Sequence, residues 1–185
     1  MTNPTVRNGT RKPTLAQRGF TLIELLATLI VLAVVVAIAV PNLGAFVSSS
    51  RLRASQSELV SALSLARSEA TKRGVNVGVQ ALAASAPAGR EFNPGWRVFV
   101  DEDGDRAYTP GPPAELVLRD YPAVSDEFRF GTVGGKTKAI FNSRGFVTDG
   151  GVVFTLCGKA GVKRGYRIQL EQVGLADVVE GESCT

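Results

Sequence analysis

The sequence predicts an α+β protein in which a long N-terminal α-helix packs on a C-terminal antiparallel β-sheet domain. An apolar run over residues 20–40 is followed by an amphipathic helical pattern that ends near residue 73. From residue 74 on, short runs rich in valine and phenylalanine alternate with glycine, proline and aspartate turns, which is typical of antiparallel strands. We therefore expect a leader (1–19), a membrane or filament-core helix (20–40), its amphipathic second half (41–73) and a β-rich globular domain (74–185).

The leader carries all of the net charge. Residues 1–19 hold four basic side chains and no acid, which equals the formal charge of +4, and the rest of the chain has 17 bases and 17 acids. The basic isoelectric point is therefore no argument for nucleic-acid binding. The chain has no histidine, which excludes the usual general base and the commonest zinc ligand. We expect no enzyme, no cofactor and no bound metal.

The apolar run is long enough to cross a membrane. Residues 20–40 contain only three polar side chains, Thr21, Glu24 and Thr28, and about 20 apolar residues span a bilayer core of ~30 Å. The basic leader places the N-terminus in the cytoplasm and the rest of the chain outside the inner membrane. One alternative is a secretory signal peptide cut near the "AIA" of residues 37–39, although such apolar regions usually have about 7–15 residues. A second alternative is a simple membrane anchor.

Glu24 argues against both alternatives. A carboxylate in the bilayer costs on the order of 3 kcal/mol, so such a residue indicates a function and a cationic partner. Residues 20–40 contain no lysine or arginine. Cleavage between Gly19 and Phe20 would create an α-amine four residues before the carboxylate, and the amine of another copy would serve equally well.

The stretch "RGFTLIELLATLIVLAVVVAIAVPN", residues 18–42, resembles the leader and first helix of type IV pilins and type II secretion pseudopilins. The resemblance implies cleavage after Gly19 by prepilin peptidase and N-methylation of Phe20. It also implies that Glu24 acts in assembly by pairing with the amine of a neighbouring subunit. Pro41 lies where these helices commonly carry a proline.

The helical pattern continues beyond Pro41, where we expect a kink or a local break. Apolar residues then recur on one helical stripe, at Leu52, Leu59, Leu63, Ala66 and Ala70. The sequence "KRG" at residues 72–74 is a typical helix end, with cations in the last turn and a glycine after it.

Seven strands are expected after the helix, at residues 75–80, 96–100, 115–121, 127–130, 138–141, 151–156 and 166–171. Two long loops, residues 81–95 and 101–113, interrupt the pattern. The stretches "NPGWRVFVDEDGD", "FNSRGFV" and "FTLC" are similar to the globular domain of GspH/FimT-type minor pilins and pseudopilins. This resemblance implies a structural subunit of a type IV pilus or a type II secretion pseudopilus. Its partners would be other pilin or pseudopilin subunits, prepilin peptidase and the inner membrane.

The two cysteines, Cys157 and Cys184, form a disulfide if the domain lies in an oxidising compartment. Such a bridge would stabilise the domain by about 3–4 kcal/mol and tie the final strand and tail to the sheet. The alternative is a pair of unconnected thiols in a cytosolic protein. The membrane segment favours the bridge.

An acidic stretch could bind calcium. Asp101, Asp103 and Asp105 alternate as at the start of an EF-hand loop. The glycine comes too early, however, and no glutamate occupies the twelfth position. The favoured interpretation is a solvated hairpin tip rich in aspartate and glycine, and calcium binding is the alternative.

Charge is unevenly distributed along the domain. Residues 91–127 have nine acids and three bases, whereas residues 129–167 have eight bases and one acid. The basic block would neutralise phosphates, pair with the acidic block, or face a neighbouring subunit.

DNA uptake is the alternative function. Some FimT-type minor pilins bind DNA through a C-terminal Gly-Arg-x-Arg turn, and "VGLADV" at residues 173–178 occupies the matching place. Gly174 is kept, but Leu175 and Asp177 stand where the arginines would be, and Asp177 would repel phosphate. A substitute DNA site lies in "VKRGYR", with Tyr166 stacking on a base; its residues are Lys163, Arg164, Tyr166 and Arg167.

Overall fold

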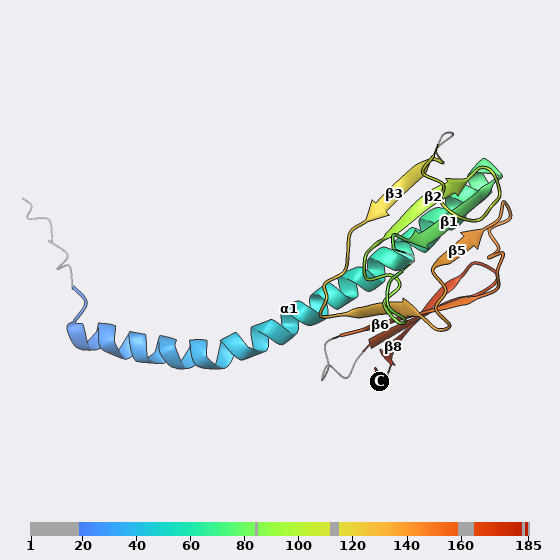
Figure 1. Ribbon diagram of the computed structural model, residues 1–185. Helices are drawn as coiled ribbons and strands as arrows, with labels where there is room; N and C mark the ends of the chain where they lie inside the picture. Colours follow the sequence, from blue (N-terminus) through green and yellow to red (C-terminus); the bar gives the residue numbers. More distant parts are fainter. Residues whose placement is uncertain (1–18, 84, 112–114, 159–164, 183, 185) are drawn as a thin grey trace, which may run out of the picture. The chain divides into compact units, whose positions relative to one another are not determined.

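The computed structural model describes residues 19–83, 85–111, 115–158, 165–182 and 184. Within these ranges a single long helix precedes two antiparallel sheets (Figure 1). The chain divides into two compact units, one up to Leu43 and one from Gly44 onwards. The long helix crosses this division.

Helix α1 extends over Leu22–Arg73. Thr21 caps its N-terminus, because the Glu24 backbone N–H donates to Thr21 Oγ1 at 3.3 Å. The predicted end is confirmed: Lys72 and Arg73 form the last turn, and Gly74 follows with a φ of 72°. Of the two outcomes expected at Pro41, the local break is wrong, since the helix continues through this residue; the kink stays a prediction. Proline removes one backbone donor, and the remaining hydrogen bonds of the turns on either side keep the helix continuous.

The first unit consists of the apolar part of α1. The window Leu22–Ala39 has a mean hydropathy of 2.9 and is exposed throughout, so it is long and apolar enough to cross a membrane. Exposed leucine, isoleucine and valine side chains over such a length are unfavourable in water. This segment therefore requires a lipid or protein environment.

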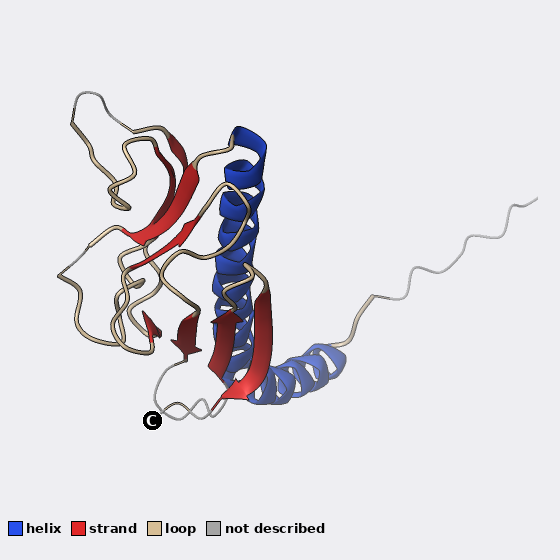
Figure 2. Ribbon diagram, turned by 90° about the vertical axis from the view of Figure 1, so that its right-hand side faces the viewer, coloured by secondary structure: helices blue, strands red, loops and turns tan. Residues whose placement is uncertain are grey.

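The second half of α1 supplies one side of the domain core. The five residues of the predicted stripe are at most 3% exposed, which confirms the helical periodicity. They pack with aromatic side chains from both sheets, among them Trp96, Phe130 and Phe154. Figure 2 shows the strands beside this half of the helix.

Eight strands form two four-stranded antiparallel sheets with the orders β3-β2-β1-β5 and β4-β6-β7-β8. Their bounds are β1 Asn76–Ala81, β2 Trp96–Asp101, β3 Val117–Tyr121, β4 Arg129–Thr132, β5 Lys138–Phe141, β6 Val152–Cys157, β7 Gly165–Leu170 and β8 Ala176–Glu182. Seven strands were expected from the sequence, and β8 was missed. Most residues of β8 are exposed, so the strand shows no alternation of buried and exposed positions. It is held in place by pairing with β7.

A disulfide joins Cys157, at the end of β6, to Cys184, two residues beyond β8. Most of the expected tail is therefore itself a strand, and the bond ties the segment after β8 to the end of β6, next to Gly165 at the start of β7. A sequence separation of 27 residues corresponds to a stabilisation of about 3–4 kcal/mol on the chain-entropy estimate.

Candidate functional sites

The residues of the predicted processing and assembly site lie at the N-terminal end of α1. Phe20 is 84% exposed, and Gly19 precedes it outside the helix. Glu24 lies in the first turn, on an exposed face that continues through Ala27, Thr28, Val31, Leu32 and Val35. A single carboxylate thus begins an otherwise apolar helix face.

The structure adds a local role for Glu24 that the sequence analysis missed. Thr21 is the N-cap and Glu24 is the third helical residue, the Thr-x-x-Glu arrangement of a capping box. An acidic side chain in the first turn also interacts favourably with the helix dipole. The Thr-x-x-Glu spacing in the sequence was the available signal. Capping and pairing with a neighbouring amine are therefore two separate explanations of this residue.

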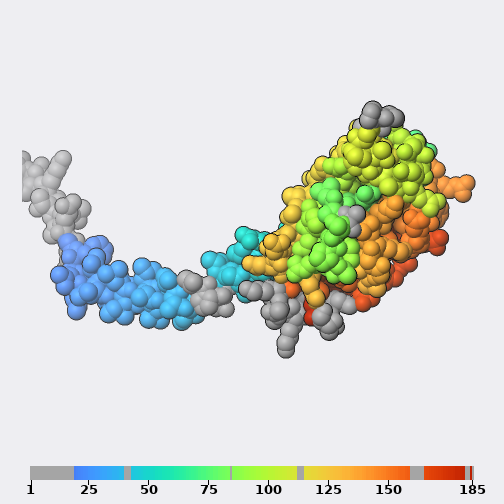
Figure 3. All heavy atoms as spheres, in the orientation of Figure 1, coloured from blue at the N-terminus to red at the C-terminus, as the bar shows by residue number. Residues whose placement is uncertain are grey.

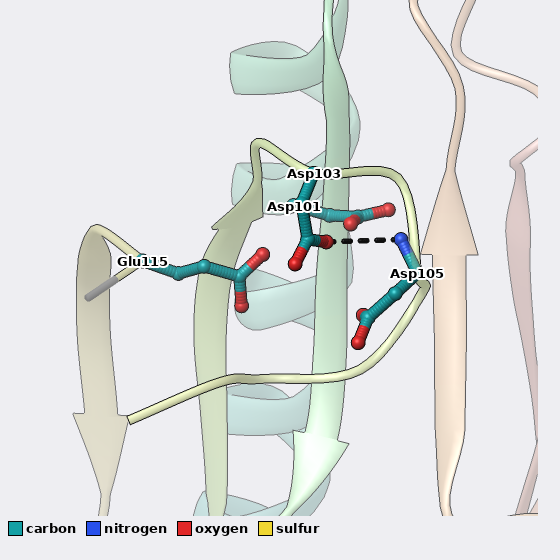
Figure 4. Close-up of side chains that lie close together, drawn as sticks. All are labelled: Asp101, Asp103, Asp105 and Glu115. Carbon is teal, nitrogen blue, oxygen red and sulfur yellow. Dashed lines mark hydrogen bonds between the residues drawn. The ribbon is translucent and has the colours of Figure 1, made fainter. Parts of the chain in front are cut away.

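The acidic loop after β2 brings four carboxylates together (Figure 4). Ligand oxygens of Asp101, Asp103, Asp105 and Glu115 all lie within 4.8 Å of one another. Glu115, which the sequence analysis had not included, comes from the segment that leads into β3. Hard cations such as Ca²⁺ are bound by oxygen sets of this chemistry.

Backbone N–H groups hold these carboxylates in place. Asp101 Oδ1 accepts from Gly104 N at 2.9 Å, and Glu115 Oε1 and Oε2 accept from Glu102 N at 3.2 Å and Thr109 N at 2.8 Å. Asp103 and Asp105 each accept from a backbone N–H two residues further on. These contacts are those of a tight turn rich in aspartate, so the convergence of the acids follows from the loop itself.

The loop also covers the outer face of the first sheet. The ring of Tyr108 stacks edge-on against buried Phe99 with 5.7 Å between centroids, and its backbone N–H donates to Gln80 Oε1 at 3.0 Å. Arg97 lies over the same ring, 4.2 Å from its centroid. Figure 3 shows the described part of the loop as yellow-green spheres at the upper end of the domain. Its aromatic contacts give it a packing role.

Burial raises the pKa of Glu115 above 4.5, and the neighbouring carboxylates of Asp103 and Asp101 add to the rise, against two lowering backbone hydrogen bonds. A raised carboxyl pKa in the folded state contributes stability below the unfolded pKa, and this contribution is lost as the pH rises through the folded value. We therefore expect the unfolding free energy of the parent, relative to that of Glu115→Gln, to fall as the pH rises above about 4.3, the ordinary pKa of a glutamate. Chemical denaturation of the full chain in mild detergent at several pH values measures this difference. The same experiment on Glu102→Gln, an exposed neighbouring carboxylate, controls for total charge, and a flat or rising difference for Glu115→Gln would contradict the assignment.

The expected DNA site is not assembled by the described residues. Lys163 and Arg164 lie outside them. Tyr166 is only 8% exposed, and its hydroxyl accepts a hydrogen bond from Arg53 Nε at 3.2 Å. The expectation that its ring stacks on a base is therefore corrected: it packs in the core. Arg167 is half-buried on β7, opposite Thr155 of β6 and Val179 of β8.

The "VGLADV" stretch forms the turn between β7 and β8 and the start of β8. Gly174 is buried with a φ of 79°, whereas Leu175 is 58% exposed. Asp177 is exposed on β8, where its Oδ1 accepts from Val178 N at 3.0 Å. The turn thus presents an apolar residue and an acid to solvent.

A groove that the sequence analysis did not predict lies next to this turn. It has a volume of about 540 Å³ between α1 and the turn. The helix wall is mostly polar but includes Val60 and Leu63, and the opposite wall is formed by the turn and Arg144. The lining residues are Val60, Leu63, Ser64, Arg67, Ser68, Thr71, Arg144, Gly174, Leu175 and Ala176. Arg67 and Arg144 are far apart in the sequence, which is why their proximity was not foreseen.

The family described as type II transport protein GspH matches residues 55–174, and the prokaryotic N-terminal methylation motif matches residues 15–40. The pilin-like protein PilA1 of Thermus thermophilus is 35% identical over 99 residues, which cover 52% of this chain and 56% of the relative. The match therefore spans little more than half the length of that relative.

Two solved structures share the fold. The type IV minor pilin FimU of Pseudomonas aeruginosa superposes with a TM-score of 0.59 at 19% identity, covering 76% of this chain and 99% of FimU. The minor pseudopilin EpsH from the type 2 secretion system of Vibrio cholerae gives a TM-score of 0.50 at 12% identity, covering 70% of this chain and 96% of EpsH. At these identities the likeness concerns the fold alone, and it confirms the predicted helix packed on antiparallel sheets.

Proposed function

Because the chain belongs to the GspH family of minor pilins and pseudopilins and carries the N-terminal methylation motif, we propose that it is a structural subunit of a type IV pilus or a type II secretion pseudopilus. The family consists of structural proteins and not of enzymes, and its members assemble with other pilins after processing by prepilin peptidase. Cleavage falls between Gly19 and Phe20, and Phe20 becomes N-methylated. Assembly then proceeds through the N-terminal part of α1.

The observation that carries this proposal is one carboxylate at the start of an exposed apolar helix. Glu24 lies in the first turn of α1, and the 18-residue apolar window Leu22–Ala39 is exposed throughout. A charge in a lipid environment is retained for a partner of opposite sign. The α-amine of a neighbouring processed subunit supplies it, and the pair sets the axial register of the bundle. The remaining apolar face packs against the same helix of its neighbours.

The subunit waits in the inner membrane before assembly. The basic leader stays in the cytoplasm, the apolar part of α1 crosses the membrane once, and the β-rich domain from residue 74 onwards lies in the periplasm. The disulfide between Cys157 and Cys184 agrees with an oxidising compartment. Once in the filament, the domain faces outward towards neighbouring subunits or cargo.

DNA binding receives no support from the described residues. Tyr166 is buried, and Asp177 and Leu175 occupy the turn. A phosphate backbone would meet an acid at this turn, which disfavours binding. We therefore do not propose a role as DNA receptor.

Mass spectrometry of the protein extracted from membranes tests the proposal. We expect a mature chain that begins at Phe20 and carries one N-terminal methyl group. The variant Gly19→Val should keep the leader, because it changes the residue on the amino side of the cut, whereas Ala16→Val three residues upstream should be processed normally. An intact N-terminus in the parent, or trimming near Ala39, would contradict the proposal.

A further inference from the structure

The groove between α1 and the β7–β8 turn carries positive charge, and no acid among the described residues lines it. The charge comes from two guanidinium groups, Arg67 and Arg144. Neither arginine takes part in an ion pair with a described residue, whereas Arg97, Arg106 and Arg73 each pair with an acid elsewhere. Guanidinium groups bind carboxylates with strong, often bidentate hydrogen bonds.

Arg67 is held in place by close packing against two backbone turns. A Cβ atom added at Gly174 would lie 3.0 Å from Arg67 Nε, and one added at Gly145 would lie 3.2 Å from the same atom. Both glycines have a φ of 79°, and Val147 N donates to the carbonyl of Gln172 at 2.9 Å, which joins the two turns. The Arg67 side chain therefore lies against both turns, which restricts its rotamers and reduces the entropy cost of binding.

The groove is apolar as well as cationic. Val60 and Leu63 line the helix wall, and Leu175 projects from the turn with 58% exposure. Phe146 and Val173, from the same two turns, are 43% and 48% exposed. Arginine combined with exposed apolar side chains is typical of protein–protein contacts. Asp177 is exposed two residues beyond Leu175 on β8 and disfavours a nucleic-acid backbone.

We propose that this groove binds an acidic segment, with an adjacent apolar residue, of a neighbouring pilin-like subunit. The inference rests on the proposed function, because a subunit assembled through α1 must present the uncovered face of that helix to its neighbours. A carboxylate of the partner pairs with Arg67 and Arg144. The apolar residue beside it packs on Val60, Leu63 and Leu175, and the hydroxyl groups of Ser64, Ser68 and Thr71 remain at the polar edge.

Site-specific photo-crosslinking of the full chain in its native membrane tests this contact. A benzophenone side chain replaces Leu175, and crosslinked peptides are identified by mass spectrometry. We expect a peptide from a second pilin-like subunit in which aspartate or glutamate lies next to an apolar residue. The exposed charge reversal Arg144→Glu should lower the yield by about tenfold, as expected for losing one charge-assisted hydrogen bond.

The matched control is Arg119→Glu, an exposed arginine on β3 outside the groove, which should leave the yield unchanged. Arg67→Gln, which keeps the length of the side chain, should also lower it. Equal yields in the parent and both groove variants would overturn the inference. Binding of short duplex DNA that disappears in Arg144→Glu would overturn it as well, in favour of a nucleic acid.

The inference and the proposed function fail in distinguishable ways. A chain that is cut after Gly19 and co-purifies with pilins, yet crosslinks independently of both arginines, leaves the subunit role intact and removes the groove contact. A chain that keeps its leader and co-purifies with no pilin removes both.

Discussion

Replacing Gly174 with alanine will destabilise the globular unit by about 2–5 kcal/mol, a large fraction of the stability of a typical domain. Two effects add. The φ of 79° is a left-handed conformation that costs an alanine roughly 1–2 kcal/mol. The new Cβ would also lie 2.1 Å from the carbonyl oxygen of Gly145, which is backbone and cannot rotate away as a side chain would. Urea denaturation of the full chain in mild detergent measures the loss.

Gly150→Ala is the matched control for this substitution. Gly150 has a φ of 72°, and nothing lies within 4 Å of an added Cβ, so it carries only the conformational cost of roughly 1–2 kcal/mol. The difference between the two variants isolates the contact between the β7–β8 turn and Gly145. Equal losses would mean that the two turns do not touch as described.

Gly174 also shows where inference from the sequence was limited. By resemblance it belonged to a ligand-binding turn, whereas the structure gives it a packing role between two turns and Arg67. Tyr166 was likewise expected at a binding site and has a packing role in the structure. An aromatic residue in a basic stretch suits base stacking and core packing equally well, so the sequence alone does not decide between them. Burial decides between these roles, and burial depends on contacts between distant residues.

The regular elements were predicted more successfully. The stripe from Leu52 to Ala70 and the helix end at Arg73 follow from local periodicity and capping, which the sequence displays directly. Strand β8 was missed because Ala176–Glu182 has no alternation of buried and exposed residues. Its structure comes from pairing with β7, which only the fold reveals. The groove was missed for the same reason, since its arginines lie on α1 and in the loop after β5.

The largest functional effect is expected from Glu24. Glu24→Ala should be inserted into the membrane and cut after Gly19 like the parent, but its incorporation into filaments should fall by at least about tenfold. The carboxylate costs on the order of 3 kcal/mol in lipid, and pairing with the amine of a neighbour offsets this cost in the assembled state. Without the charge, the apolar helices lose the interaction that sets their register. Co-purification with other pilin subunits, normalised to the amount of processed protein, measures incorporation.

Glu24→Gln separates this explanation from helix capping. Glutamine at the third helical position keeps the backbone bond to Thr21 Oγ1 and also suits a capping box, but it carries no charge to pair with an amine. If the charge is what assembly requires, Glu24→Gln will be as defective as Glu24→Ala. Glu58→Gln removes an exposed carboxylate from the second half of the same helix and should assemble normally. Recovery of incorporation by Glu24→Gln alone would show that the residue acts by capping α1, and the pairing with a neighbouring N-terminus would then be wrong.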